Sequence, residues 1–469
     1  MNELEDQQSL ASSLSLPSPL RHYQWEGVAF LVARSAALLA DQMGLGKTVQ
    51  AAVALRLALA QPDCNRVLVV CPAPLCLNWE LELTRWAPQL AIRRVRGPIQ
   101  DRLATYRLPI PVLIASFEQV RQDSPLLPSD VRFDLVVVDE AQRIKNASSS
   151  TAESCRLLPR QRSWALTGTP LQNRVEDLIS VFQYVKRGLL TRGMTRQEIH
   201  ERIQPHLLRR TKELVLPELP EITYQDLLLE LTVEQRAAYD ALWDQRETVI
   251  TSAGTPASPA SMLALITRLK QLCNVDPETG ASSKADVLRT ITESLGEPTQ
   301  RVLVFSQYVS TLRWLAERLE HFPVDFYHGE LNEEERLASL SRFANARGPR
   351  GLFATYQAGG VGLNIQAATV VVLFDRWWNP AVEDQAIERA HRFGRRLPLL
   401  VYRFLCADSI EERIEQILAV KRATARTYVD EAPNASDARL PRDELRRILG
   451  LSVAEVDGTT GQDRGAAQD

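Results

Sequence analysis

The chain has 469 residues and a mass of 52.7 kDa, and at roughly 100–200 residues per domain this length predicts about three domains. Its content of 45% hydrophobic and 24% charged residues is ordinary for a soluble globular protein. The 55 basic and 58 acidic residues give a net charge of −3, which argues against nucleic-acid binding through bulk positive charge but allows a local basic cleft.

Other classes are excluded by cysteine usage and hydropathy. Six Cys with no C-x-x-C pair predict neither a disulfide framework nor a structural zinc site. The N-terminal MNELEDQQ lacks the basic start and apolar core of a signal peptide. The longest apolar stretch, 28–40, contains Arg34 and is too short to cross a bilayer. We therefore expect a cytoplasmic protein with no membrane partner.

Lysine is scarce in this chain. Seven of the 55 basic residues are Lys and the others are Arg, a bias that the codon usage of a GC-rich genome explains. The bias nevertheless makes each Lys informative, because a compact ammonium enters a phosphate cradle more readily than a planar guanidinium does.

Short apolar runs alternate with helical patterns from residue 19 onward, after a polar, Ser-rich and flexible arm over residues 1–18. The first set of runs lies at 37–40, 66–71, 111–116, 134–138 and 163–167, and the second at 301–305, 324–327, 351–355, 370–374 and 400–405. Continuous apolar strands between helices are typical of parallel sheets buried on both faces. The pattern predicts an α/β fold with two such domains, over residues 19–200 and 285–430.

The segment between the two predicted domains has a different pattern. Residues 201–284 are rich in Leu, Arg, Glu and Gln, with a loop of Ser, Pro, Ala and Gly at 251–261, and we expect a helical insertion and linker. Residues 431–469 form a polar C-terminal tail, in which 441–451 predicts one short helix.

A candidate phosphate loop, DQMGLGKT, spans residues 41–48. It follows the apolar run 37–40 and opens a predicted helix at 49–59, which is the setting in which backbone amides and a helix N-terminus bind phosphate. A chance Gly-rich turn is the alternative, but the coincidence of strand, GKT and helix disfavours it.

Each residue type in this loop has an expected task. Gly44 and Gly46 let the backbone wrap the phosphates, Lys47 contacts the β- and γ-phosphates, and the Thr48 hydroxyl ligates magnesium. Asp41 occupies the position of the first Gly in the general pattern, so the strict motif is not met.

Two acidic residues follow the apolar run at 134–138. Asp139 is a candidate magnesium ligand, and Glu140 is a candidate to polarise the attacking water. An acidic pair after a strand is more often a helix cap, so the pair gains its meaning from the phosphate loop in the same domain.

Two arginines far downstream complete the candidate chemistry. Arg389 and Arg392 are spaced i, i+3 on one predicted helix face, so both could reach a γ-phosphate. A solvated basic face is the alternative reading in so Arg-rich a chain.

These segments together resemble the Swi/Snf family of helicase-like ATPases, in order and over about residues 20–425. The resemblance rests on the phosphate loop with its Asp41, the acidic motif DEAQRIKN (139–146) and an ordered series of other segments: LRHYQWEG (20–27), VVCP to NW (69–79), ASFE (115–118), LTGTPLQN (166–173), LRRTK (208–212), VFSQY (304–308), YHG (327–329), QAGGVGLN (357–364), DRWWNP (375–380) and QAIERAHRFG (385–394). Three positions depart from the family pattern, namely Gln142, Glu388 and Arg395.

The resemblance implies two RecA-like lobes that bind ATP and Mg²⁺ between them and translocate on double-stranded DNA. By this resemblance Gln24 reads the base, and Arg389 and Arg392 are the fingers of the second lobe. The implied coupling residues are Thr167, Gly168, Thr169 and Gly360, and the implied DNA contacts are Pro72, Ser116, Ser306, Gln307 and Trp378. Partner proteins could target so small a motor.

Two other functions stay open at this point. One is an RNA or single-strand helicase of the wider superfamily, and the other is a nucleotide-gated DNA-binding scaffold that hydrolyses ATP too slowly to translocate. Stimulation by different nucleic acids separates the first from a duplex translocase, and turnover with saturating DNA separates the second.

Overall fold

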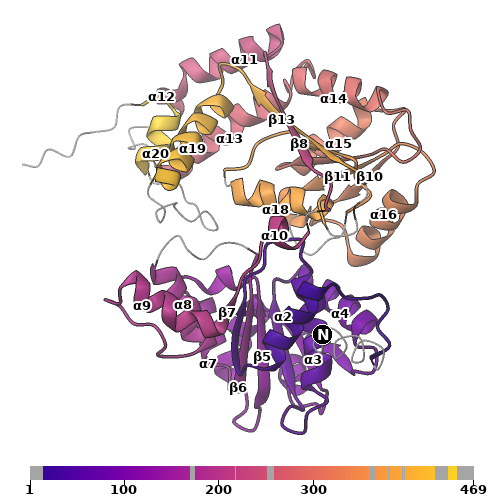
Figure 1. Cartoon of the computed structure of the whole chain (residues 1–469). Coiled ribbons are helices and arrows are strands. Elements are labelled where there is room, and N and C mark those ends of the chain that lie inside the picture. The colour runs from indigo at the N-terminus through magenta and orange to yellow at the C-terminus, as the bar shows by residue number, and fades with distance from the viewer. Residues whose placement is uncertain are drawn as a thin grey trace, which may run out of the picture.

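A computed structural model describes residues 14–168, 175–216, 218–250, 258–359, 365–378, 380–392, 395, 397–427 and 442–451. The described chain forms two α/β lobes, one above the other in Figure 1, joined by the segment around the short helix α10 (Lys212–Val215). The expected α/β fold with two parallel sheets is confirmed.

The first lobe contains a seven-stranded parallel sheet. Its strand order is β3 (Ile92–Arg94), β4 (Val112–Ser116), β2 (Val67–Cys71), β5 (Phe133–Asp139), β6 (Arg160–Leu166), β1 (Ala36–Leu39) and β7 (Leu207–Leu208). Along β5, Val136 and Val138 enter one hydrophobic core while Leu135 and Val137 enter the other. The sheet is therefore buried on both faces, which explains its continuous apolar strands.

The second lobe contains a six-stranded parallel sheet. Its order is β10 (Val324–Tyr327), β11 (Arg350–Thr355), β9 (Arg301–Ser306), β12 (Val370–Leu373), β13 (Leu399–Cys406) and β8 (Ile222–Leu229). Here too, Leu303 and Phe305 of β9 face one core, and Val302 and Val304 face the other.

Helices cover both sheets. Those of the first lobe are α2 (His22–Val32), α3 (Lys47–Ala58), α4 (Leu75–Trp86), α5 (Ile99–Thr105), α6 (Phe117–Asp123), α7 (Ser150–Leu157), α8 (Val175–Val185) and α9 (Arg196–Ile203), with 3₁₀ turns at Ser124–Leu126, Ala141–Ile144 and Gln204–His206. Those of the second are α14 (Ser283–Glu293), α15 (Val309–Arg318), α16 (Glu333–Asn345), α17 (Tyr356–Gly359) and α18 (Pro380–Ala390). Helix α18 lies at the junction, beside α10 (Figure 1).

A separate group of helices packs beside the second sheet (Figure 1). It comprises α11 (Val233–Asp244), α12 (Arg246–Ile250), α13 (Pro259–Asn274), α19 (Ile410–Thr427) and α20 (Arg442–Ile448), which share one hydrophobic core. The short helix expected at 441–451 is therefore present as α20, and the rest of the predicted tail, 452–469, lies outside the described residues.

The segment predicted as a helical insertion and linker, 201–284, also contains two strands. Strand β7 joins the first sheet beside β1, and the eight-residue β8 pairs with β13 along its whole length in the second. Both are edge strands, and most residues of β8 are exposed, so the continuous apolar run that identifies a buried strand is missing.

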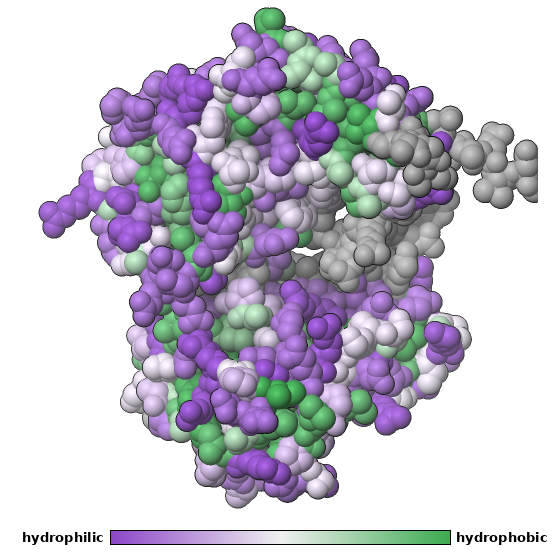
Figure 2. Space-filling model, turned by 180° about the vertical axis from the view of Figure 1, so that it is seen from behind, coloured by the Kyte–Doolittle hydropathy of each residue, from purple (hydrophilic) through white to green (hydrophobic). Residues whose placement is uncertain are grey.

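The molecular surface is mostly hydrophilic and is hollowed where the two lobes meet (Figure 2). In the part of the chain that the structure describes, no helix is both long and apolar enough to cross a bilayer.

Candidate active site

The phosphate loop lies between the end of β1 and the start of α3. Gly44 and Gly46 have φ values of +88° and +76°, a left-handed conformation that glycine adopts without steric cost. The Lys47 ammonium donates to the carbonyl oxygens of Asp41, at 2.6 Å, and Gln42, at 3.3 Å. Burial lowers the pKa of Lys47 to about 8, although Glu140, Asp41 and Asp139 all favour its charged form. A phosphate group would add an anionic hydrogen-bond acceptor for this ammonium, whose acceptors here are carbonyl oxygens.

Asp41, which broke the general loop pattern, is fully buried in an ion pair. Its carboxylate accepts from Arg210, with Nε–Oδ1 at 3.0 Å and Nη2–Oδ2 at 2.6 Å, and from Gln50 Nε2 at 3.2 Å. A bidentate Arg–carboxylate pair fixes both orientation and distance. Asp41 therefore holds the phosphate loop against the connector between the lobes, a role that its sequence position did not reveal.

The two carboxylates end strand β5. Asp139 Oδ2 accepts from Trp79 Nε1 at 2.9 Å, and its Oδ1 accepts from the Glu140 amide at 2.8 Å. Glu140 itself has φ +55° and ψ +53°, an uncommon conformation for a residue with a side chain and one that clusters at functional sites. Burial, and then the neighbouring Glu140, raise the pKa of Asp139 to about 6.

Magnesium fits this donor set. The Thr48 hydroxyl and the Asp139 carboxylate line the same cavity, and both offer the hard oxygen ligands that Mg²⁺ requires. A divalent cation beside Asp139 would also offset the cost of its buried charge.

Gln142 connects Glu140 to the coupling segment. Its Nε2 donates to Glu140 Oε2 at 2.5 Å, and its Oε1 accepts from the Thr167 hydroxyl at 2.9 Å. Gly168 lines the pocket, and a Cβ there would come within 2.4 Å of Met43 Cγ. Although Gln142 departs from the family pattern, its side chain thus links Glu140 to Thr167. The other two coupling residues, Thr169 and Gly360, lie outside the described residues.

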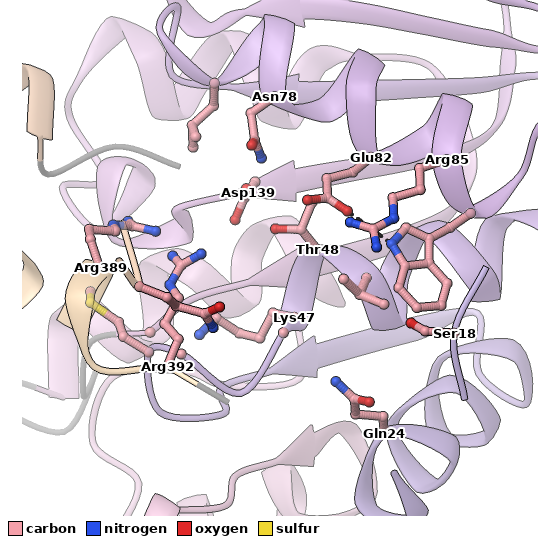
Figure 3. Close-up of a pocket in the computed structure, with 18 of the residues that line it drawn as sticks. Ser18, Gln24, Lys47, Thr48, Asn78, Glu82, Arg85, Asp139, Arg389 and Arg392 are labelled. Atoms are coloured by element: carbon pink, nitrogen blue, oxygen red, sulfur yellow. Dashed lines mark hydrogen bonds between the residues drawn. The ribbon is translucent and has the colours of Figure 1, made fainter. Parts of the chain in front are cut away.

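Arg389, in the last turn of helix α18, and Arg392, just after the end of this helix, enter the pocket from the second lobe (Figure 3). Arg389 Nη2 lies 4.0 Å from Glu140 Oε1, and Gln385 Nε2 donates to the same oxygen at 3.4 Å. Arg392 Nε is buried and has no hydrogen-bond partner within the described ranges. Burial, and then Arg389, lower the pKa of Arg392 to about 9, so a polyanion would relieve both effects.

All the predicted catalytic and nucleotide-binding residues line this one cavity, of about 250 Å³. Gln24 lies on the side opposite the arginines (Figure 3), 6% exposed, with its Oε1 accepting from the Arg21 amide at 3.0 Å. Its Nε2 lies close to Gly46, where a Cβ would come within 2.8 Å.

The sequence did not predict that helix α4 forms one wall of the nucleotide cavity. The additional lining residues on this helix are Leu75, Asn78, Glu82, Arg85 and Trp86. Trp86 donates to Glu82 at 3.0 Å, and the Arg85 guanidinium lies 5.8 Å from its ring centre. The motif over 69–79 reaches the first turns of helix α4. The later turns of α4 contain no sequence motif that predicts nucleotide binding.

The DNA-contact candidates of the first lobe lie at the carboxyl ends of the neighbouring strands β2 and β4. Pro72 is buried, and Ser116 is 5% exposed. Ser116 Oγ accepts from the Gln119 amide at 3.2 Å and so caps helix α6. The capping alternative therefore accounts for Ser116 in this conformation.

The candidates of the second lobe are also engaged within the protein. Ser306 is fully buried and donates to Asp375, and Gln307 Nε2 donates to the Arg376 carbonyl at 2.5 Å. Trp378 is half-buried, with the Lys270 ammonium 4.7 Å from its ring centre. In this conformation the Ser306 hydroxyl is therefore not available to a phosphate.

Arg395, another departure from the family pattern, supports the end of the finger segment. It is 7% exposed, and its Nη1 donates to the carbonyls of Ala368, at 2.6 Å, and Ala390, at 3.1 Å, while Nη2 donates to Pro398 at 2.6 Å. Its contacts are thus with backbone rather than with the pocket.

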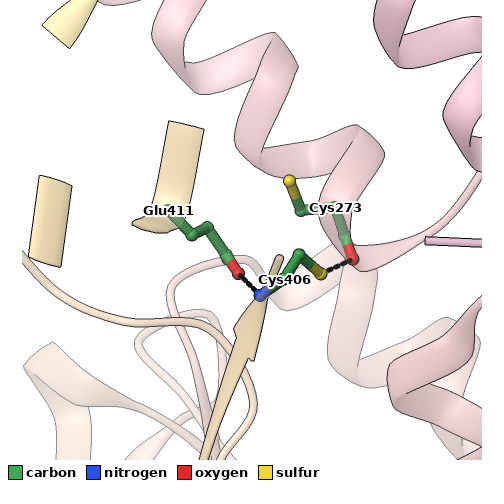
Figure 4. Close-up of side chains that lie close together, drawn as sticks. All are labelled: Cys273, Cys406 and Glu411. Carbon is green, nitrogen blue, oxygen red and sulfur yellow. Dashed lines mark hydrogen bonds between the residues drawn. The ribbon is translucent and has the colours of Figure 1, made fainter. Parts of the chain in front are cut away.

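A cluster of metal-ligand side chains, Cys273, Cys406 and Glu411, lies away from this pocket (Figure 4). Glu411 accepts from Lys284 at 2.7 Å and from the Cys406 amide at 3.1 Å, and Cys406 Sγ lies 3.5 Å from the Cys273 carbonyl. The carboxylate charge is thus balanced by Lys284, and the cluster joins α13 to β13 and α19.

Two family models match the chain. The SNF2-related domain covers residues 23–278, more than half of the chain, and the helicase conserved C-terminal domain covers residues 283–394. The chain belongs to the SNF2 family. Its two parallel-sheet lobes agree with the α/β fold of two sheets that the sequence predicted.

Relatives come from bacteria and plants. The chain is 34% identical to an uncharacterized ATP-dependent helicase of Mycoplasma pneumoniae, over 96% of this chain and 46% of the relative. It is 31% identical to the putative ATP-dependent helicase/translocase YwqA of Bacillus subtilis, over 94% of this chain and 52% of the relative. The chain therefore spans about half the length of these curated relatives.

A solved structure is also similar, the Sulfolobus solfataricus SWI2/SNF2 ATPase core in complex with dsDNA. It shares 28% identity over 93% of this chain and 98% of that chain, with a TM-score of 0.43.

Proposed function

We propose that this chain hydrolyses ATP and couples hydrolysis to movement on double-stranded DNA. The observation that carries the proposal is the convergence of both lobes on one carboxylate: Arg389 of the second lobe lies 4.0 Å from Glu140 of the first. Catalytic groups separated by 249 positions, 140 to 389, meet when the lobes are together, so lobe closure and chemistry are linked.

The residues divide the reaction between them. Lys47 and the loop amides bind the β- and γ-phosphates, while Gln24 and the α4 wall orient the nucleoside end. Glu140 accepts a proton from water as the water oxygen bonds to the γ-phosphorus and the bond to the bridging oxygen of ADP breaks. Arg389 and Arg392 stabilise the charge on the transferring phosphoryl group.

Thr48 and Asp139 are the residues that would hold Mg²⁺, which when bound neutralises phosphate charge. The remaining electrostatic work falls to Lys47 and the two arginines, which all line the same cavity.

Movement on DNA follows if both lobes contact one backbone and ATP favours their closed arrangement. The support for this step is the family membership and the name of the Bacillus subtilis relative, a putative translocase. Pro72, Ser116, Ser306, Gln307 and Trp378 remain the proposed contacts. For Ser306 to bind a phosphate, its contact with Asp375 must exchange when DNA binds.

A steady-state ATPase assay with duplex DNA, single-stranded DNA or RNA tests the proposal. We expect weak basal hydrolysis that rises with duplex DNA and falls with added salt, because phosphate contacts release counterions. Glu140→Gln should reduce turnover by about 10²–10⁴-fold while MgADP still binds.

The alternatives predict different results. Stimulation by RNA or single strands but not by duplex DNA would identify a helicase of the wider superfamily. ATP turnover that stays at background with saturating DNA would favour the nucleotide-gated DNA-binding scaffold. A fully active Glu140→Gln protein would overturn the assignment of Glu140 as the catalytic base.

A further inference from the structure

Lys212 lies where the connector between the lobes, the phosphate loop and helix α18 meet. It begins α10, in the connector that leaves the first sheet at β7 and enters the second at β8 (Figure 1). It is 5% exposed, although it is charged and lies in a short connecting helix. Its burial needs an explanation, because an unpaired buried ammonium is costly.

One side of Lys212 packs on the phosphate loop. Its backbone amide donates to Gln42 Oε1 at 2.8 Å. A Cβ added to Gly44 would lie 2.9 Å from Lys212 Cε, so the loop backbone and the lysine stem are in direct contact. Any shift of the loop at Gly44 is therefore transmitted to Lys212.

The other side of Lys212 binds the finger helix α18. Its ammonium forms an ion pair with Glu388 and donates to the His391 carbonyl at 2.8 Å. Glu388 directly precedes Arg389, and His391 directly precedes Arg392. The tie therefore acts on the last turn of α18, which carries Arg389, and on the residues just after it, which include Arg392.

His391 makes a second connection between the same elements. Its Nε2 lies 2.7 Å from the Pro220 carbonyl, which is an acceptor, so Nε2 carries the proton. Burial lowers the pKa of His391, and in the neutral ring Nδ1, 3.4 Å from the Lys212 ammonium, is an acceptor. The finger helix is thus held to the connector at Lys212 and again at Pro220.

We propose that Lys212 is a positioning residue that ties the finger helix to the phosphate loop and so sets where Arg389 and Arg392 lie relative to the nucleotide. This inference rests on the proposed ATPase function. Lys212 does not line the nucleotide cavity, so it acts through α18 rather than on the substrate.

The charged groups around Lys212 make the tie sensitive to pH. Glu388 faces it from α18, and His391 and Arg392 from the residues just after α18. Lys47 faces it from α3, and Glu213 from its own helix. Burial, and then Arg392, lower the pKa of Lys212 to about 7. The protonated form makes the ion pair, so the tie weakens as pH rises through this value.

Steady-state kinetics of Lys212→Met with saturating duplex DNA test the proposal, with exposed Lys186→Met as the matched control. We expect kcat to fall about 10- to 100-fold, as when catalytic groups are displaced by about 1 Å, while MgADP affinity changes less than about threefold. Lys186→Met should match the wild type in both measurements.

Two further variants separate positioning from folding. Lys212→Met leaves Glu388 without its cation, so the double variant Lys212→Met/Glu388→Gln removes both charges and should restore the unfolding midpoint but not kcat. Lys212→Arg keeps its charge at alkaline pH, so the alkaline fall of kcat/KM near pH 7 should move upward relative to the wild type.

Three outcomes would overturn the inference. In the first, Lys212→Met retains kcat within twofold while Glu140→Gln is inactive, which leaves the proposed function intact. In the second, MgADP affinity falls as much as kcat, which makes Lys212 a support of the phosphate loop alone. In the third, the wild-type chain itself does not hydrolyse ATP, which removes the proposed function as well.

Discussion

Buried lysines distinguish this Arg-rich chain at the scale of single residues. Lys212, Lys270 and Lys284 are each at most 5% exposed. Lys270 donates to the Arg376 carbonyl at 2.6 Å, and Lys284 pairs with Glu411 at 2.7 Å. A compact ammonium satisfies one or two acceptors in a closed space, whereas a guanidinium brings five donors that all need partners. The scarcity of Lys in the sequence pointed to the phosphate loop, and the structure adds these internal lysines to it.

The Lys284–Glu411 pair gives a prediction for stability. Both side chains are fully buried, and the Glu411 carboxylate outweighs the burial that disfavours the Lys284 charge, so the pKa of Lys284 is raised. Lys284→Met should lower the free energy of unfolding by about 3–5 kcal/mol, because Glu411 is left buried and unpaired. Chemical denaturation followed by Trp fluorescence measures the loss.

Two controls define the cause of that loss. Lys284→Met/Glu411→Gln removes both charges and should be clearly more stable than the single variant. Arg313→Met breaks an ion pair with Glu330 whose two side chains are more than half exposed, and it should cost less than about 1 kcal/mol. Equal losses for Lys284→Met and Arg313→Met would contradict the role of burial.

Gln142 gives a second prediction, on coupling. It joins Glu140 to Thr167, so Gln142→Ala should leave both side chains without this bridge. We expect about a tenfold loss of DNA-stimulated turnover, about 1.4 kcal/mol, with MgADP affinity retained. A larger effect on MgADP affinity than on turnover in isothermal titration and ATPase assays would show that Gln142 supports the pocket instead.

Among the structural elements, the phosphate loop depends on the connector as much as on its own sequence. Asp41→Gly would restore the general loop pattern but remove the buried carboxylate that Arg210 binds through two nitrogens, leaving Arg210, which is 8% exposed, with Glu26 at 3.0 Å. We expect the unfolding midpoint and the ATP affinity both to fall, with a cost of about 1–3 kcal/mol, because charged hydrogen bonds are lost while Glu26 still balances the guanidinium. Asp41→Gly/Arg210→Met should recover stability, and improved ATP binding by Asp41→Gly would contradict this account.

The sequence predicted the elements that are buried on both faces. The apolar runs at 66–71, 134–138 and 301–305 correspond to β2, β5 and β9, because a central parallel strand has no polar face. Strands β3 and β8 were missed because each has exposed residues that interrupt the apolar run, and β7 has two residues. Pairing with a neighbouring strand, which is a tertiary property, decides such segments.

In the candidate site, too, local sequence patterns predicted some residues and tertiary contacts determined the others. Motif residues such as Lys47 and Glu140 were placed by short local patterns that strand and helix geometry keep together. Arg85 and Arg210 reach the site or its supporting loop from parts of the fold whose positions no local pattern specifies. Lys212 lay in a quoted motif, yet its contact with the finger helix depends on how the two lobes meet.

At the scale of the whole molecule, a second ionic contact joins the lobes, through elements other than those that carry Arg389 and Arg392. Glu333, in the first turn of α16, accepts from Arg94 Nη1 at 2.9 Å and from Arg96 Nη2 at 3.0 Å. Arg94 ends the edge strand β3 and its side chain is 12% exposed, and Arg96 lies two residues further on. Arg94 also pairs with Glu80 of its own lobe at 2.6 Å, which holds its side chain in place. This contact favours the arrangement in which the fingers meet Glu140.

Glu333→Gln should therefore shift the lobes toward more separated arrangements. Each surface pair contributes about 0.2–1 kcal/mol, so the ratio of closed to separated arrangements should fall by up to about fivefold per pair, as single-molecule energy transfer between labels on the two lobes would show. Glu334→Gln changes the charge equally at the next position and is the matched control. At 1 M salt, where the screening length is about 3 Å, the wild type and Glu333→Gln should converge. A shift that persists at 1 M salt, or that Glu334→Gln reproduces, would show that net charge or helix stability rather than this contact sets the lobe equilibrium.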